Sequence, residues 1–113
     1  MSYKASGLRA WVVQRITAIY IGLMFVYLLG KFMFAAPASA AEFQGWATGP
    51  VVSVALLLLV AAVLVHAWVG VRDILIDYVW ATALRVTLLS LLALFLIACG
   101  FWAAQVLIVA QIA

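Results

Sequence analysis

Four residues of this chain carry side chains that can do chemistry where they stand: His66, Asp77, Tyr78 and Arg15. His66 is the sole histidine, and it lies inside a long apolar segment. A polar side chain in such a segment is costly unless it has a partner or a function. Asp77 and Tyr78 follow the same segment, and Arg15 stands at the start of an earlier one. These residues are therefore the candidates for a functional site.

His66 allows two interpretations. The imidazole either hydrogen-bonds to another helix, which is a structural role, or it is an axial ligand of haem iron. Helical spacing places it on one stripe with mostly small residues, namely Ala55, Leu59, Ala62 and Gly70. Such a stripe admits either a close neighbouring helix or a flat ligand. A haem with two histidine ligands would have to be shared with a partner or lie on a homodimer axis, because the chain has one histidine.

Asp77 and Tyr78 also allow two interpretations. A tyrosine hydroxyl can donate a hydrogen bond to a carbonyl, and an adjacent carboxylate can order water or deliver protons. The alternative is a solvated loop with an aromatic anchor at the membrane surface. If the helix persists, Asp73 and Asp77 continue the stripe of His66. Arg15 either sets the topology or neutralises the carboxylates of a bound cofactor.

The composition decides the class of protein. The 113 residues are 72% hydrophobic and 8% charged, and the mean hydropathy is +1.36. These values exclude a soluble globular domain and a disordered chain, and one cysteine excludes a disulfide scaffold within the chain. A spanning helix needs roughly 20 apolar residues. We therefore expect an all-α membrane protein, a single domain over 1–113, with three transmembrane helices running up, down and up.

The apolar runs predict helices at about 16–34, 51–72 and 85–107, an external loop at 35–49 and a cytoplasmic connection at 73–84. We interpret 35–49 as a loop rather than as the end of a signal peptide, because the apolar run before it is too long for one. Pro50 suits the first turn of the second helix.

The basic residues predict the orientation. Five of the six, all except Lys31, lie in the N-terminal flank or around the second connection. Both segments fall on one side of a three-helix protein, and basic residues favour the cytoplasmic side. We therefore expect a multi-pass protein with a cytoplasmic N-terminus and an external C-terminus.

One segment resembles a known family. The run from His66 to Val79 reads His-Ala-Trp-Val-Gly-Val-Arg-Asp-Ile-Leu-Ile-Asp-Tyr-Val, and Ala83-Leu84-Arg85 follows. It strongly resembles the hydrophobic membrane anchor of succinate dehydrogenase (succinate:quinone oxidoreductase, complex II). The stretch Arg15-Ile16-Thr17-Ala18-Ile19 is similar to the family's R-x-T-A-I motif. The chain departs from the family at Trp80-Ala81, where many members carry a basic residue and a proline.

The resemblance implies a place in a quinone-reducing complex of the bacterial inner membrane. The partners would be a flavoprotein with FAD, an iron–sulfur protein with its clusters, and a sister anchor chain, the cytochrome b chain. By similarity, His66 would be one axial ligand of haem b, with the other ligand on the sister anchor chain. Tyr78 would hydrogen-bond a carbonyl of ubiquinone, Asp77 would support that site and its proton supply, and Arg15 would lie near the haem propionates.

The leading hypothesis is thus a non-catalytic membrane anchor that helps electrons pass from succinate to quinone, in the tricarboxylic acid cycle and the respiratory chain. No complete active site and no nucleic-acid partner are expected. The alternative is a small component of a transporter or channel with His66 as a proton relay. All three acidic residues lie near or outside the expected membrane interfaces, which weighs against transport. A purely structural assembly factor would leave His66, Asp77 and Tyr78 unexplained.

Overall fold

A computed structural model of the chain describes the backbone of residues 3–113 and the side chains from residue 7 onward. Three long helices and one short helix make up nearly all of this range: α1 (Tyr3–Phe34), α2 (Ala40–Ala47), α3 (Pro50–Tyr78) and α4 (Thr82–Ile112). The three long helices are long and apolar enough to cross a membrane. The predicted all-α fold with three spanning helices is confirmed.

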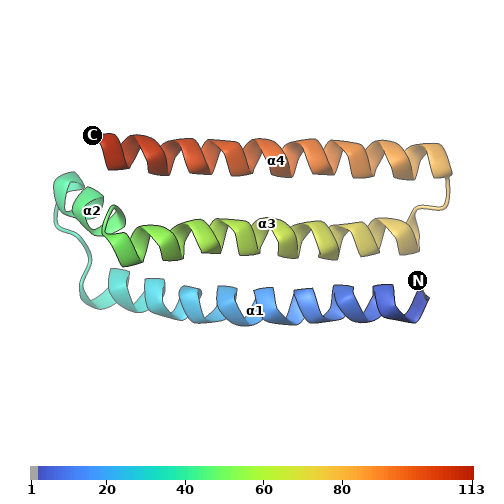
Figure 1. The fold of residues 1–113 in the computed structure, drawn as a ribbon, viewed down its shortest axis with the longest axis horizontal. Helices are drawn as coiled ribbons and strands as arrows, with labels where there is room; N and C mark the ends of the chain where they lie inside the picture. The colour runs from blue at the N-terminus through green and yellow to red at the C-terminus, as the bar shows by residue number, and fades with distance from the viewer. Residues whose placement is uncertain (1–2) are drawn as a thin grey trace.

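The long helix α3 lies between α1 and α4, and each neighbour runs antiparallel to it (Figure 1). The start of α1 and the connection from α3 to α4 lie at one end of the molecule, whereas α2 and the C-terminus lie at the other. The two segments that carry most of the basic residues therefore share one end. The side chain of Lys4, which belongs to the predicted cytoplasmic flank, is outside the described residues.

The helix α3 is longer than the apolar pattern indicated. It was expected to end at residue 72 but continues to Tyr78, and the backbone becomes extended at Val79, with φ −102° and ψ 108°. The connection to α4 is therefore residues 79–81 rather than 73–84. Charges mark where a segment leaves the lipid, but a helix ends only where its backbone changes conformation, and 73–78 contains no glycine or proline.

The outer helices differ from expectation for the same reason. Helix α1 begins at Tyr3 rather than near 16, and α4 runs from Thr82 to Ile112 rather than over 85–107. The polar N-terminal segment continues the helical hydrogen bonding of the apolar segment, because extending a formed helix is far easier than nucleating one. Pro50 occupies the first turn of α3, as expected.

The predicted external loop 35–49 contains the short helix α2. Its N-cap is Ser39, whose hydroxyl accepts the backbone N–H of Glu42 at 3.2 Å. The Glu42 carboxylate in turn accepts the backbone N–H of Ala38 at 2.8 Å. This Ser-x-x-Glu exchange satisfies donors that would otherwise be unpaired at a helix start, so it fixes where α2 begins.

Aromatic side chains join α2 to the end of α1. The rings of Phe32, Phe43 and Trp46 lie within 6.3 Å of one another, centroid to centroid. The Trp46 indole N–H donates to the Tyr27 hydroxyl at 3.4 Å, and Lys31 Nζ lies 5.8 Å from the Trp46 ring. Aromatic rings with polar edges and a nearby cation are typical of a membrane surface, so this cluster marks the level at which the chain leaves the lipid.

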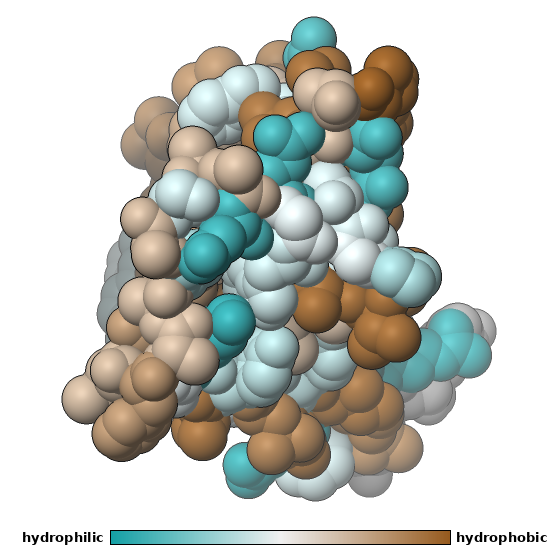
Figure 2. Space-filling model, turned by 90° about the vertical axis from the view of Figure 1, so that its left-hand side faces the viewer, coloured by the Kyte–Doolittle hydropathy of each residue, from teal (hydrophilic) through white to brown (hydrophobic). Residues whose placement is uncertain are grey.

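Two glutamines join α2 to the end of α4. Gln44 Nε2 donates to the carbonyl of Ala110 at 3.2 Å, and Gln111 Nε2 donates to the carbonyl of Thr48 at 3.3 Å. The last carbonyls of a helix have no partner within it, so Gln44 satisfies one of them. Figure 2 looks along the helices onto this end and shows a band of hydrophilic residues across it.

The chain has almost no core of its own. Among the residues that the structure describes, Ala47, Ser53 and Val69 are the ones that are buried. The accessible surface is 8162 Å², whereas a compact soluble protein of this mass exposes about 6,100 Å². Most large apolar side chains point outward, and such a surface must be covered by lipid or by other chains.

Candidate functional site

His66 lies half-buried on the face of α3 that packs against α1. Its Nδ1 is 3.0 Å from the Thr17 hydroxyl oxygen. The same hydroxyl lies 2.8 Å from the Val13 carbonyl and 3.1 Å from the Gln14 carbonyl, both on α1. The imidazole is therefore held to a neighbouring helix of its own chain by one ring nitrogen. Its other nitrogen, Nε2, makes no hydrogen bond within the described part of the chain.

The stripe of small residues around His66 is the surface on which α1 packs. At Gly70, an added Cβ would lie 3.2 Å from Gln14 Nε2, so the absence of a side chain lets Gln14 fit there. On the other side of His66, the Tyr20 hydroxyl donates to the carbonyl of Ala55 at 2.7 Å. Close approach of a helix, one of the two uses expected for this stripe, is therefore observed.

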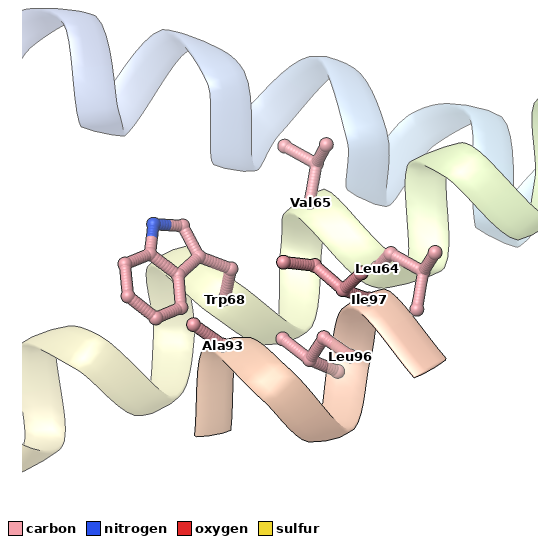
Figure 3. A pocket seen from close by; sticks show the side chains of 6 residues that line it. All are labelled: Leu64, Val65, Trp68, Ala93, Leu96 and Ile97. Atoms are coloured by element: carbon pink, nitrogen blue, oxygen red, sulfur yellow. The ribbon is translucent and has the colours of Figure 1, made fainter. Parts of the chain in front are cut away.

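Two open apolar grooves lie along α3 close to His66 in the chain, although His66 itself lines neither. One, of about 310 Å³, lies between α1 and α3 and is lined by Ile16, Thr17, Tyr20, Leu58, Ala61, Ala62 and Val65. The other, of about 320 Å³, lies between α3 and α4 and is lined by the residues labelled in Figure 3. Val65 belongs to both linings, and in Figure 3 its side chain points toward α1. A flat apolar ring or a partner's side chains would find hydrocarbon walls at this level.

Gln14 adds a second polar side chain to the interface. Its Oε1 is buried and has no hydrogen-bond partner among the described residues. It lies one turn of α1 from Thr17, toward the end that carries Asp77 and Tyr78. An acceptor buried without a partner is uncommon in folded proteins, so Gln14 marks this part of the α1–α3 interface as polar.

Asp77 and Tyr78 form the last turn of α3 rather than a loop. Both side chains are exposed, that of Tyr78 to 79%. Within the described residues, neither side chain makes a hydrogen bond or an ion pair. Asp77 shares the helical face of His66, about 17 Å further along the axis, whereas Tyr78 points about 100° away from Asp77. The nearby Arg72 pairs with Asp73 at 3.1 Å. The chain alone thus presents Asp77 and Tyr78 outward and does not enclose a site around them.

Arg15 does not join His66. It precedes Thr17 by two residues, which on a helix is about 200° of rotation, so it lies on the far side of α1 from α3. It is exposed, and its guanidinium lies 5.3 Å from the ring of Trp11. This geometry is typical of a cation–π contact at a membrane surface.

Comparison with known proteins identifies the family. The family described as "Succinate dehydrogenase/Fumarate reductase transmembrane subunit" matches residues 1–105. The chain belongs to this family. A protein of Coxiella burnetii named "Succinate dehydrogenase hydrophobic membrane anchor subunit" is 30% identical over 105 residues, which is 93% of this chain and 91% of the relative.

Two further anchor proteins of the same name are similar. The protein of Rickettsia felis is 36% identical over 95 residues, which cover 83% of this chain and 78% of the relative. The protein of Rickettsia prowazekii is 29% identical over 97 residues, or 85% and 77% of the two chains. The resemblance drawn from the His66–Val79 motif is confirmed at the level of the family.

Within this member of the succinate dehydrogenase transmembrane family, two contact residues carried no predicted role. They are Gln14 and Thr17, which face α3 as Tyr20 does. Their spacing of three residues inside an apolar helix was a readable signal, because polar side chains that recur on one helix face point to an interface. Thr17 was part of the R-x-T-A-I motif, yet only its arginine was assigned a role.

Proposed function

We propose that this chain is the hydrophobic membrane anchor of a bacterial succinate dehydrogenase. It would attach the flavoprotein and the iron–sulfur protein to the inner membrane, together with a sister anchor chain. The family match over residues 1–105, the names of the relatives and the three apolar helices support this assignment. The large exposed apolar surface supports a permanent partner within the membrane.

The residues around His66 fit a haem b shared with the sister chain. A ligating histidine engages its second ring nitrogen in a hydrogen bond, and His66 does so through Nδ1 while Nε2 is left for iron. The grooves on both sides of α3 offer hydrocarbon walls. When bound, the haem supplies a one-electron redox centre. Since this chain has one histidine, a second histidine ligand would have to come from its partner.

Arg15 has a proposed role at the edge of the same group. Its exposure on the outer side of α1 leaves the guanidinium accessible to a carboxylate carried by a neighbouring chain or its cofactor. Guanidinium–carboxylate pairs form strong charge-assisted hydrogen bonds, so a propionate is a suitable partner.

Asp77 and Tyr78 would contribute to the ubiquinone site. The Tyr78 hydroxyl is exposed and has no partner in the described chain, so it is free to donate to a quinone carbonyl. Reduction of a quinone by two electrons consumes two protons, and the Asp77 carboxylate can order the water that delivers them. Both residues stand on a helix end, which fixes their positions more firmly than a loop would.

The basic residues give the proposed orientation. Arg9, Arg15, Arg72 and Arg85 lie toward one end of the three helices, and Lys31 lies toward the other. By the positive-inside rule, the first end is cytoplasmic, which places Asp77 and Tyr78 on the same side as the soluble partner proteins.

The observation that carries the proposal is the half-buried His66 held through Nδ1 at an interface between spanning helices. The sequence also disfavours the alternative function, a proton relay through His66. A relay needs a further ionisable group within the membrane, whereas the apolar runs 16–30, 51–71 and 86–113 contain no charged residue.

A reduced-minus-oxidised visible spectrum tests the proposal. The complex is purified through a tag on this chain, with His66→Ala as the variant and Val63→Ala, an exposed position of the same helix that lines neither groove, as the control. We expect a b-type haem band in the wild type and in the control, and its loss in His66→Ala. A band that persists in His66→Ala would remove the ligand assignment. Absence of both haem and a co-purifying flavoprotein from the wild type would refute the anchor function and favour the transporter.

A further inference from the structure

We propose that Thr17 is the positioning residue of His66: its hydroxyl oxygen accepts the Nδ1–H proton and so leaves Nε2 unprotonated as the iron ligand. This inference rests on the proposed haem ligation and adds a residue to it. The observation behind it is the 3.0 Å contact between Thr17 Oγ1 and His66 Nδ1.

The direction of this hydrogen bond follows from the other neighbours of the hydroxyl. Thr17 has one hydroxyl proton, and Oγ1 lies 2.8 Å from the Val13 carbonyl oxygen and 3.1 Å from that of Gln14. Both carbonyl oxygens can only accept. If the hydroxyl proton went to His66 instead, Oγ1 would face two carbonyl oxygens at these distances with no proton between them.

The favourable arrangement gives the hydroxyl proton to Val13 and leaves the Oγ1 lone pairs for His66. Nδ1 must then carry the proton of the neutral imidazole. Nε2 is consequently unprotonated and keeps its lone pair. In this tautomer Nε2 is the nitrogen that can bind a metal. A helix of the same chain thereby selects the tautomer of the imidazole before any partner chain arrives.

Thr17 is well suited to hold this position. A threonine in a helix is stiff at χ1, and the bond to the carbonyl four residues earlier fixes which rotamer it adopts. Small residues of α3 bring α1 close, and the Tyr20 bond to Ala55 holds the two helices together nearby. The hydroxyl is thus fixed by its own helix and by the packing of α1 on α3.

Loss of the hydroxyl should weaken the haem site in two measurable ways. Removing the hydrogen-bond partner of a ligating histidine typically costs about 10–100-fold in metal affinity. It also makes the imidazole a poorer electron donor, which disfavours ferric iron and raises the midpoint potential.

The test compares Thr17→Val, which has the shape of threonine without the hydroxyl, with Thr17→Ser, which keeps it, both in the purified complex. The control is Thr87→Val, because Thr87 makes the same kind of bond, to the Ala83 carbonyl at 2.8 Å, on the exposed side of α4. The readouts are the rate at which haem is lost to a scavenging apoglobin, the midpoint potential and the low-spin electron paramagnetic resonance spectrum.

We expect Thr17→Val to lose haem about 10–100-fold faster, with a raised potential and an altered spectrum. Thr17→Ser and Thr87→Val should match the wild type. Wild-type behaviour of Thr17→Val, or equal effects of Thr17→Val and Thr17→Ser, would overturn the inference. If Thr17→Val does not assemble, Thr17→Ala decides by the same criteria.

His66→Ala separates this inference from the proposed function. Haem loss in His66→Ala with an unaffected Thr17→Val would leave the ligand assignment intact and refute the role of Thr17. Persistence of haem in His66→Ala would refute the ligand assignment, and the inference with it.

Discussion

The Tyr20 hydroxyl donates a 2.7 Å hydrogen bond to the carbonyl of Ala55 and so ties α1 to α3 within the apolar part of the molecule. We expect Tyr20→Phe to destabilise the assembled protein by about 1 kcal/mol, since hydrogen bonds between membrane helices contribute about 0.6–1.7 kcal/mol. Thermal unfolding of the purified complex measures this. Tyr27→Phe, which removes a longer 3.4 Å contact, is the control and should change the midpoint less. Equal midpoints for the wild type and Tyr20→Phe would contradict the prediction.

Tyr78→Phe should impair reduction of a soluble quinone analogue while succinate oxidation with an artificial acceptor continues. Removing one hydrogen bond to the developing charge of a quinone is expected to cost roughly 10–100-fold in kcat/KM, which corresponds to about 1.4–2.8 kcal/mol. The ratio of the two activities in isolated membranes is the measurement. Equal loss of both activities would point to failed assembly instead of a quinone contact.

Gly100 fixes the spacing of α3 and α4, because a Cβ there would lie 2.9 Å from Leu64 Cδ1. Gly100→Ala should be tolerated within about 1 kcal/mol, since the end of the leucine side chain can move and alanine favours the helix. Gly100→Ile should lower the unfolding temperature of the complex, because overpacking reduces the free energy of unfolding by about 1–3 kcal/mol.

Gly30 is the matched control for this pair, since nothing lies within 4 Å of a Cβ built there. Gly30→Ile should therefore cost less than Gly100→Ile. The reverse order would show that contacts with other chains, and not the Leu64 contact, govern the tolerance of these helices.

Gln44→Leu should loosen the short helix α2 from the end of α4. The bond from Gln44 to the Ala110 carbonyl contributes about 0.5–1.5 kcal/mol. Amide hydrogen exchange over residues 40–47 should therefore become roughly 2–10-fold faster while exchange in the middle of α3 is unchanged. Ala41→Leu, an exposed position of α2, is the control. Unchanged exchange in Gln44→Leu would show that the aromatic cluster and the Gln111 bond to Thr48 are sufficient to hold α2.

A reporter fused after Ala113 tests the orientation. An enzyme that is active only outside the cytoplasm should be active there, and one fused within 79–81 should be inactive. The opposite pattern would reverse the assignment and would place Asp77 and Tyr78 away from the soluble partner proteins.

The sequence predicted the number, order and antiparallel arrangement of the long helices, because hydrocarbon thickness leaves few choices for apolar runs of this length. The sequence did not predict correctly where these helices begin and end. Asp73 and Asp77 were interpreted as parts of a connection since they are charged, yet charge measures contact with water and not the end of a helix. The Ser39-x-x-Glu42 capping signal for α2 was present and was passed over in favour of the proline and glycines around it.

The candidate site was predicted in part. His66 was recognised because a lone imidazole in an apolar run is conspicuous, but its partner was not, since a threonine in a helix can also satisfy its hydroxyl locally. The packing of α1 against α3 shows that the Thr17 hydroxyl contacts both the Val13 carbonyl of its own helix and His66 of α3. Arg15 was expected near the haem propionates by resemblance, and this stays a proposal; helical rotation directs its side chain to the side of α1 away from His66.

The length of α3 has a consequence for the proposed quinone site. With 29 residues, α3 is about 44 Å long, whereas the hydrocarbon layer is about 30 Å thick. Tilt alone would have to reach roughly 47° to submerge it, well beyond the average of about 20° for spanning helices. The end of α3 that carries Arg72, Asp73 and Asp77 therefore projects from the lipid, because charged side chains are costly within it. If Tyr78 binds a quinone as proposed, the ring would have to leave the acyl chains and move along the protein surface, while its isoprenoid tail stays in the bilayer.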